Sequence, residues 1–341
     1  MGIKQLNKLL KSKCKDCINI INLNNFSGKI IAVDISIYLY KYISTNKSNF
    51  TDMFILQILK LYKNNILPFY IFDGKPPDAK NDIIQNRKNN KKNIEQKIKD
   101  LENDPSNSDA IKKLKSKCIY VTRNHINKCK ELFNLFGVPY IEANGEAEAL
   151  CSKLCKDGYI YGVLSEDFDV LPFGSKYFIK SFNFKTNNVI VYDLKLILEK
   201  LKLSYSSFVD MCILCGCDYC PSIYGLGPVN SYKHILKYKN IETFFENNKK
   251  YKIPENFNYI KARTLFNTHY TQNDLNEINN KILIKKPNIE KILIFLKNNN
   301  TKLNSKYIKL INKKLIINYN NIFKLHNNTN KKQLEITSFF K

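Results

Sequence analysis

The chain has 341 residues and a formal net charge of +25, a length that predicts about two domains or one large one. It contains no run of about 18 uncharged apolar residues and no signal-peptide pattern, which argues against a membrane or secreted protein. The charge indicates a polyanionic partner, but it is nearly all lysine in a chain rich in Asn, Ile, Tyr and Phe, as A/T-rich genomes encode. We therefore expect a soluble intracellular protein without membrane contact, and the charge by itself is weak evidence for nucleic acid.

Ten cysteines raise the question of zinc. The pair Cys14 and Cys17 and the series from Cys212 to Cys220 have spacings that zinc sites use. Cys212 and Cys215, however, fall in an apolar helix pattern, and no further Cys or His pair stands at a zinc-finger spacing. We interpret the cysteines as free thiols in a reducing compartment.

Two strand patterns near the start of the chain each end in an aspartate. Residues 1–28 carry apolar side chains at helical spacing, and the β-formers of 29–33 then run into Asp34. A second apolar run, 68–72, ends in Asp73. Because ligands of open α/β sheets bind at the carboxyl ends of the strands, we expect both aspartates at one functional edge.

The segments between these strands predict two helices, over 35–42 and 53–62. Tyr40 lies in the first of them, beside the expected edge. A tyrosine there either belongs to the core or serves as a platform on which a nucleobase stacks.

A long charged stretch, 78–117, follows the second strand and is too polar to form core. A turn at 103–109 divides it into a helical hairpin. Lys80 and Arg87 are two helical turns apart and share one face, about 10 Å from each other. They either bind phosphate groups or belong to a solvated face, and the hairpin is either a mobile cap over the edge or a plain insertion.

The centre of the chain concentrates acidic residues in an otherwise basic sequence. An amphipathic helix over 121–136 and a strand over 137–141 lead to Glu146 and Glu148, which stand at the first turn after a glycine. A buried strand pattern over 159–164 is followed by a second acidic group, which consists of Asp167 and Asp169. Both groups are therefore placed at the same sheet edge as the earlier aspartates.

A cluster of carboxylates needs counter-cations, because two carboxylates about 4 Å apart repel by roughly 4 kcal/mol at an effective dielectric near 20. The converging side chains offer oxygen ligands and neither His nor Cys, which favours Mg²⁺ or Mn²⁺ over Zn²⁺. The alternative for any single aspartate is a solvated loop residue.

The last third of the chain predicts a strand over 189–192, a helix over 205–214 and a further helix over 229–238. Gly225 and Gly227 precede Pro228 at the start of this last helix, where exposed N–H groups bind phosphate without reading sequence. The same pattern also occurs in plain helix-opening turns.

The C-terminal residues divide into two parts. Residues 275–331 are rich in Asn and Lys and predict helices and loops that wrap the core. The final nine residues, 333–341, end in an isoleucine and two phenylalanines. They either bind a partner or fold back onto the core.

Together these segments resemble the flap endonuclease family, the structure-specific 5′ nucleases of the XPG-like/Rad2 superfamily, across essentially the whole chain. The motifs are Met1-Gly2-Ile3, Val33-Asp34, Phe72-Asp73-Gly74-Lys75-Pro76-Pro77, Gly145-Glu146-Ala147-Glu148-Ala149, Glu166-Asp167-Phe168-Asp169 and Gly216-Cys217-Asp218-Tyr219-Cys220. The resemblance implies an α/β fold with a mostly parallel central sheet flanked by helices, a PIN-like nuclease core. It also implies a helical gateway and a DNA-binding arm.

The resemblance also implies a division of the chain. The expected regions are an N-terminal nuclease region at 1–100, a helical gateway or cap at 78–134, an internal nuclease region at 135–203, a helix-two-turn-helix DNA-binding region at 204–275, a C-terminal helical wrap at 276–331, and a sliding-clamp-interacting tail at 332–341.

The family's site residues map onto this sequence as expectations. The implied metal ligands are Asp34, Asp73, Glu146, Glu148, Asp167, Asp169 and Asp218. They would hold two Mg²⁺ ions, replaceable by Mn²⁺, that straddle the scissile phosphate of a 5′ flap, activate water and stabilise the leaving 3′ oxygen.

Further roles follow from the same resemblance. Lys80 and Arg87 would stabilise the phosphate, Tyr40 would stack on a base, and Gly225 and Gly227 would hold duplex DNA beside a bound K⁺. The clamp-interacting residues would be Gln333, Ile336, Phe339 and Phe340. A monomer that works with a PCNA-like sliding clamp in replication and repair is implied, in the nucleus, a viral replication site or an organelle.

The sequence also departs from the family. The segment between Tyr40 and Phe54 is short and has few of the basic residues that shape a pocket for a one-nucleotide 3′ flap, so strict double-flap preference is not implied. Gly145 and Cys217 stand where the family more often has serine.

Two other functions stay open at this stage. One is a 5′–3′ exonuclease or bubble-cutting nuclease of the same superfamily. The other is a non-catalytic DNA-junction adaptor for the clamp, whose mark would be lost carboxylates, and none of the seven is lost.

Overall fold

The computed structural model describes residues 2–45, 49–102, 107–267, 270–299, 301–303 and 305–338, with side chains described up to residue 326. Within these residues the core is one sheet of seven strands. The strands are β1 (Ile18–Asn22), β2 (Ile30–Asp34), β3 (Leu67–Phe72), β4 (Tyr140–Glu142), β5 (Gly162–Leu164), β6 (Tyr177–Lys180) and β7 (Asn188–Asp193). No helix of this described part is long and apolar enough to cross a membrane.

The sheet is mixed but mostly parallel, as predicted. Its strand order is β1-β7-β6-β5-β2-β3-β4. Strands β6, β5, β2, β3 and β4 run parallel, and β7 is antiparallel to both of its neighbours. The central strands are uninterrupted apolar runs because helices cover both faces, and all six residues of β3 are buried.

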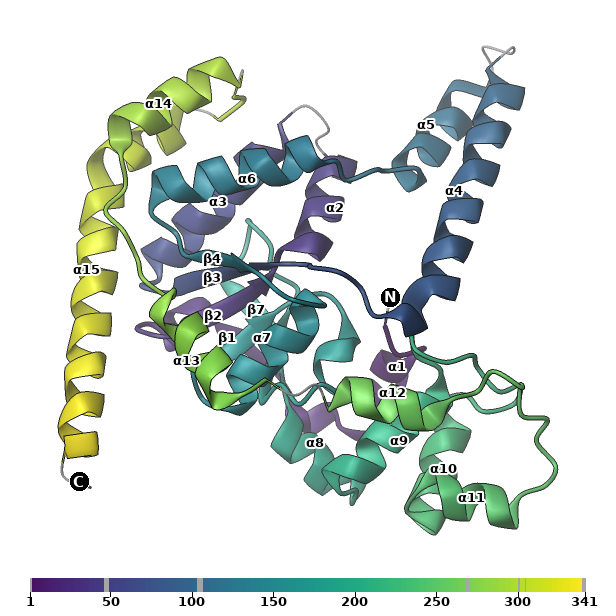
Figure 1. Ribbon diagram of the computed structural model, residues 1–341. Coiled ribbons are helices and arrows are strands. Elements are labelled where there is room, and N and C mark those ends of the chain that lie inside the picture. The colour runs from purple at the N-terminus through teal and green to yellow at the C-terminus, as the bar shows by residue number, and fades with distance from the viewer. Residues whose placement is uncertain are drawn as a thin grey trace.

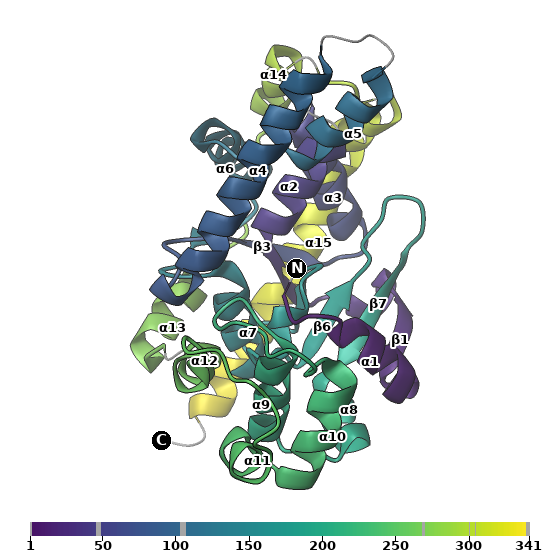
Figure 2. The ribbon, with the colours of Figure 1, turned by 90° about the vertical axis from the view of Figure 1, so that its right-hand side faces the viewer.

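Helices pack on the two faces of the sheet (Figures 1 and 2). One face carries α2 (Ile35–Thr45), α3 (Phe50–Lys63) and α6 (Arg123–Phe136). The other carries α7 (Ala147–Lys156) beneath β2, β3 and β5, and α8 (Leu194–Leu201) beneath β7. Helix α1 (Leu6–Lys13) packs against α8.

Two of the predicted strands are shorter than expected. Gly137 ends α6 in the left-handed conformation, with φ of 67°, so the segment after it turns before β4 begins at Tyr140. Strand β5 likewise begins only at Gly162, because the residues before it turn away from the end of α7. Strands β1 and β6, which the sequence analysis did not identify, extend the sheet on the other side.

A helical hairpin projects from the core (Figure 1). A short 3₁₀ turn, Asp78–Lys80, leads into α4 (Asn81–Leu101), and α5 (Ser108–Lys117) returns alongside it. Most of its side chains are exposed, although Ile98 is buried. The hairpin therefore stands beside the sheet edge, as the polar composition of this stretch predicted.

A helical arm lies below the sheet (Figure 1). It consists of α9 (Tyr205–Cys215), α10 (Pro228–Tyr238), α11 (Ile241–Asn247) and α12 (Tyr259–Phe266). Helix α9 packs against both α10 and α12. Pro228 is the first residue of α10, as predicted, because its missing N–H would have no partner there.

The C-terminal residues wrap the core with α13 (Gln272–Asn280), α14 (Ile289–Asn298) and α15 (Ser305–Ser338). Helix α15 packs along α3, on the side of the molecule away from the hairpin (Figure 1). The backbone is helical as far as Ser338. The side chains of Gln333 and Ile336, and all of Phe339 and Phe340, lie outside the described residues.

Candidate active site

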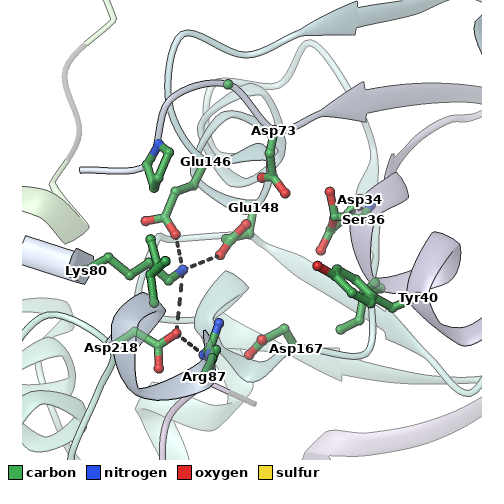
Figure 3. A pocket seen from close by; sticks show the side chains of 14 residues that line it. Asp34, Ser36, Tyr40, Asp73, Lys80, Arg87, Glu146, Glu148, Asp167 and Asp218 are labelled. Carbon is green, nitrogen blue, oxygen red and sulfur yellow. Dashed lines mark hydrogen bonds and ion pairs between the residues drawn. The ribbon is translucent and has the colours of Figure 1, made fainter. Parts of the chain in front are cut away.

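The predicted acidic residues converge at the carboxyl edge of the parallel strands. Six of the seven line one pocket of about 330 Å³, and these are Asp34, Asp73, Glu146, Glu148, Asp167 and Asp218. Figure 3 shows these carboxylates pointing toward one another. Side chains distant in the sequence therefore form a single site, as the strand patterns predicted.

Local structure explains how each acid reaches the pocket. Asp34 is the last residue of β2, and Asp73 directly follows β3, where it accepts a hydrogen bond of 2.8 Å from the Ala147 N–H. Glu146 is the N-cap of α7 and Glu148 lies in its first turn. Two residues at i and i+2 do not share the face of a regular helix, but at a helix start both reach the pocket.

Asp169 lies behind this pocket rather than in it. It is 1% exposed, and its N–H donates to Oδ1 of Asp167 over 3.2 Å. Its own Oδ1 has no hydrogen-bond partner among the described residues. The backbone of Gly2 packs against both side chains, since a Cβ at that position would stand 1.8 Å from Oδ1 of Asp167.

Burial and mutual repulsion disfavour the charged forms of these acids. Burial, followed by the charges of Asp73 and Asp167, raises the pKa of Asp34 to about 7. Burial and Glu146 together raise the pKa of Glu148 well above its ordinary value. The pocket therefore places carboxylates where they are electrostatically unfavourable without added positive charge.

Asp167 and Asp169 follow the same rule. Burial is the largest cause that raises the pKa of each. For Asp169 the charges of Asp167 and Asp218 raise the pKa further. For Asp167 the hydrogen bond from the Asp169 N–H acts in the opposite direction.

Two basic residues of the hairpin enter the cluster. Lys80 forms ion pairs with Glu146, with Glu148 at 3.6 Å and with Asp218 at 3.5 Å. Arg87 reaches Asp218 at 2.6 Å, and these pairs are the dashed lines of Figure 3. Burial by itself would lower the pKa of Lys80, but Glu148 and Glu146 hold it above its ordinary value.

The predicted common face of Lys80 and Arg87 takes a modified form. Lys80 ends the 3₁₀ turn before α4, while Arg87 lies in the second turn of that helix. Both nevertheless meet at Asp218. The hairpin therefore supplies positive charge to the pocket instead of presenting only a solvated face.

Tyr40 also lines the pocket and is 42% exposed, so it is not a core residue. The Nζ of Lys91 lies 5.4 Å from the centroid of its ring. Figure 3 shows the ring beside Asp34 and across the pocket from Lys80. Tyr40 thus has an open ring surface next to the carboxylates.

The donor set suits hard divalent cations. All the converging acidic ligands are oxygens, and Asp169 has an oxygen that nothing in the described protein satisfies. Within the described residues, no three His, Cys, Asp or Glu side chains close around a common point as they would around a bound ion. The ammonium of Lys80 lies among three of these carboxylates and holds them apart from such an arrangement.

The sequence analysis missed two side chains that orient the acids. The Ser165 hydroxyl donates to Oδ2 of Asp34 over 3.1 Å and also accepts the Asp167 N–H. The Tyr219 hydroxyl donates to Oε2 of Glu146. Each lies within two residues of a predicted acid, a proximity that was the available signal.

Gly225 and Gly227 lie outside the pocket, at the start of α10. Gly225 has φ of 83°, and its carbonyl accepts a hydrogen bond of 2.8 Å from the Asn230 side chain. Gly227 is the N-cap of α10, and a Cβ there would meet open space. The helix start therefore leaves room for a ligand beside its backbone.

Comparison with known proteins identifies the family. The model of the XPG N-terminal domain matches residues 1–94, and that of the XPG I-region matches residues 137–218. The chain belongs to the XPG/Rad2 family of nucleases. It is accordingly a hydrolase that acts on DNA. The flap endonuclease 1 of Entamoeba dispar is 36% identical over 284 residues, covering 78% of this chain and 75% of that relative.

Solved structures of the family share the fold. The catalytic core of Rad2 in complex with DNA substrate has a TM-score of 0.71 at 22% identity, over 91% of this chain and 99% of that one. The Holliday junction-resolving enzyme GEN1 in complex with product DNA and Mg²⁺ has a TM-score of 0.62 at 20% identity, over 93% and 78%. XPG-family nucleases thus include members that carry Mg²⁺ with DNA.

Proposed function

We propose that this nuclease is a structure-specific endonuclease that hydrolyses DNA at the base of 5′ flaps. The observation that carries the proposal is the joining of six carboxylates, Lys80 and Arg87 in one pocket at the foot of an exposed helical hairpin. The relationship to proteins named flap endonuclease 1 supports the same substrate. Okazaki-fragment processing and repair are the processes that need this reaction.

The seven acidic residues would hold two Mg²⁺ ions, with Mn²⁺ as a substitute. They are Asp34, Asp73, Glu146, Glu148, Asp167, Asp169 and Asp218. When bound, such ions supply an activated water and stabilise charge on the leaving oxygen. The chain contributes a rigid set of oxygens, held by strand ends and by the start of α7.

Lys80 and Arg87 would bind the scissile phosphate. Both now pair with carboxylates, and the arriving phosphate would exchange places with those partners as cations neutralise the acids. Arg87 has a side chain that is 42% exposed and so reaches a substrate from solvent. Both groups would then stabilise the negative charge that builds on the phosphate in the transition state.

The remaining contacts extend from this site. The exposed ring of Tyr40 would stack on a base beside the phosphate. Gly225 and Gly227 would hold the duplex backbone, with K⁺ nearby, and the residues 333–340 would dock on a sliding clamp. A monomer with the gateway at 78–134 and the DNA-binding region at 204–275 is the matching organisation, and a nuclear location is the matching compartment for a cellular copy.

A direct comparison of substrates tests the proposal. Labelled 5′-flap, nicked and bubble duplexes are incubated with the full chain and Mg²⁺, and parallel reactions contain a chelator. We expect the flap to be cut at its base, in Mg²⁺ alone, faster than the other two. Preferred cutting of the nick would favour an exonuclease, preferred cutting of the bubble would favour a bubble-cutting nuclease, and tight binding without cutting would favour an adaptor.

A further inference from the structure

Two cysteines bracket one of the acidic residues of the site. Cys217 and Cys220 form an isolated antiparallel bridge across a two-residue turn, and their sulfur atoms are 3.7 Å apart. Both are free thiols. Residues directly opposite each other in such a bridge have Cα atoms about 4.5–5.5 Å apart, which falls in the range of about 4.4–6.8 Å that a disulfide spans. The pair can therefore be joined without unfolding the turn.

The turn between the two sulfurs consists of Asp218 and Tyr219. Asp218 receives both hairpin cations, Lys80 at 3.5 Å and Arg87 at 2.6 Å. Tyr219 donates to Glu146, and its ring lies 5.8 Å from the Nζ of Lys80. A change in this turn would therefore reach an acid of the pocket and both basic residues at once.

Small molecules have limited but real access to the pair. Cys217 is 4% exposed and Cys220 is 7% exposed, whereas Cys212 is fully buried. Peroxide is nearly as small as water. The pair is thus protected from large oxidants and open to small ones.

We propose that Cys217 and Cys220 form a reversible disulfide when peroxide reaches the turn, and that this disulfide slows the DNA cleavage proposed above, on which this second part rests. Peroxide oxidises one thiol to a sulfenic acid and releases one water. The second thiol attacks that sulfur, which forms the S–S bond and releases another water. A dithiol reductant returns both electrons and both protons.

The expected effect follows from geometry. The sulfurs must approach from 3.7 Å to about 2.05 Å, so the turn has to tighten and carry Asp218 with it. A displacement of about 1 Å in a catalytic site can lower a rate about 10²-fold. We expect oxidation to slow flap cleavage at least about tenfold.

The experiment treats the full chain with hydrogen peroxide and then with dithiothreitol. Peptide mass spectrometry locates the cross-link, and Mg²⁺-dependent cleavage of a 5′-flap duplex is measured at each stage. We expect a Cys217–Cys220 cross-link that accompanies the loss of cleavage and disappears as the reductant restores it. Oxidation elsewhere without this cross-link, or a cross-link that leaves the rate unchanged, would overturn the proposal.

Two sets of variants separate this pair from the other thiols. Cys217→Ser and Cys220→Ser keep the size of the side chain and remove the disulfide, so cleavage should become insensitive to peroxide. The double variant Cys14→Ser, Cys17→Ser removes the other pair with two intervening residues and should keep the full response. A response that follows the second pair would contradict the assignment.

A binding measurement keeps this test independent of nuclease activity. Mn²⁺ binding to the reduced and cross-linked full chain is measured by electron paramagnetic resonance. Weaker Mn²⁺ binding after cross-linking is expected because Asp218 moves. If the reduced chain cuts no flap, the proposed function fails, whereas the cross-link and Mn²⁺ affinity still decide whether the turn is redox-sensitive.

Discussion

The carboxylate pocket and a charged cluster in the helical arm both remove acidic side chains from water, but they balance the charge differently. In the arm, Arg263 donates to both oxygens of Asp210 at 2.8 Å and to Oε1 of Glu242 at 2.9 Å. In the pocket, seven acids share two basic side chains, Lys80 and Arg87. The first cluster has a fixed internal partner, and the second has a deficit of positive charge.

The pKa shifts express this difference. Burial raises the pKa of Asp210, and Arg263 opposes that rise. Burial also raises the pKa of Asp169, but there the next causes, Asp167 and Asp218, raise it further. A matched buried pair joins α9, α11 and α12, whereas an unmatched group of acids is suited to receive cations from solution. The comparison separates charge used for structure from charge held for chemistry.

The largest expected effect concerns the two pocket cations. Lys80→Ala or Arg87→Ala should lower Mg²⁺-dependent flap cleavage about 10²- to 10³-fold, because each removes a group that faces the developing phosphate charge. Flap affinity, measured by fluorescence anisotropy, should change much less. Lys88→Ala, at an exposed position of the same helix, is the matched control and should cut normally. Normal cutting by the Lys80 variant would make that residue a structural counter-ion like Arg263.

The next effect concerns the arm and is expected in stability. Arg263→Met leaves Asp210 buried without its partner, which should lower the free energy of unfolding by about 3 kcal/mol. Urea denaturation measures this change. Cleavage per folded molecule should stay normal at low temperature. A stability change near zero would contradict the structural role of this pair.

A smaller effect of the opposite sign is expected in the pocket. Asp169→Asn removes a buried like charge at nearly constant shape, so the metal-free protein should gain about 1 kcal/mol of unfolding free energy. Urea denaturation in the presence of a chelator is the measurement. A loss as large as that of the Arg263 variant would instead place Asp169 among the stabilising charges.

The smallest effect is a pH dependence. The pKa of Asp34 is raised from 3.8 to about 7 on folding, so between these values the folded state binds more protons than the unfolded state. The stability of the metal-free protein should therefore fall as pH rises from about 4 to about 7. Thermal melting with a chelator measures this slope, and Asp34→Asn should reduce it. A melting temperature that rises through this window in the wild type alone would contradict the assigned direction for Asp34.

Much of the site was predictable because short-range patterns coincide with it. Buried strands β2, β3 and β5 are continuous apolar runs, and an acid follows or ends each of them. The helix start at α7 was marked by a glycine before Glu146, which explains how two residues at an unfavourable spacing reach one pocket. These signals lie within a few residues of the side chains that they place.

The features that the sequence did not reveal depend on distant contacts or weak patterns. Strand β6 has four residues, and β1 is half exposed at the sheet edge, so neither has a strong periodicity. The bond from Tyr219 to Glu146 joins residues 73 positions apart. The packing of Gly2 against Asp167 likewise arises only from the folded chain.

The central claim is that the unmatched acids exist to hold catalytic cations. The most direct test compares wild type with Asp169→Asn in Mg²⁺-dependent cleavage of a labelled 5′-flap duplex, with folding and flap binding measured in parallel. We predict that the variant folds and binds the flap but cuts it at least about 10³-fold more slowly, since the bound cations supply several kcal/mol of transition-state stabilisation. A folded variant that cuts at the wild-type rate would contradict the claim.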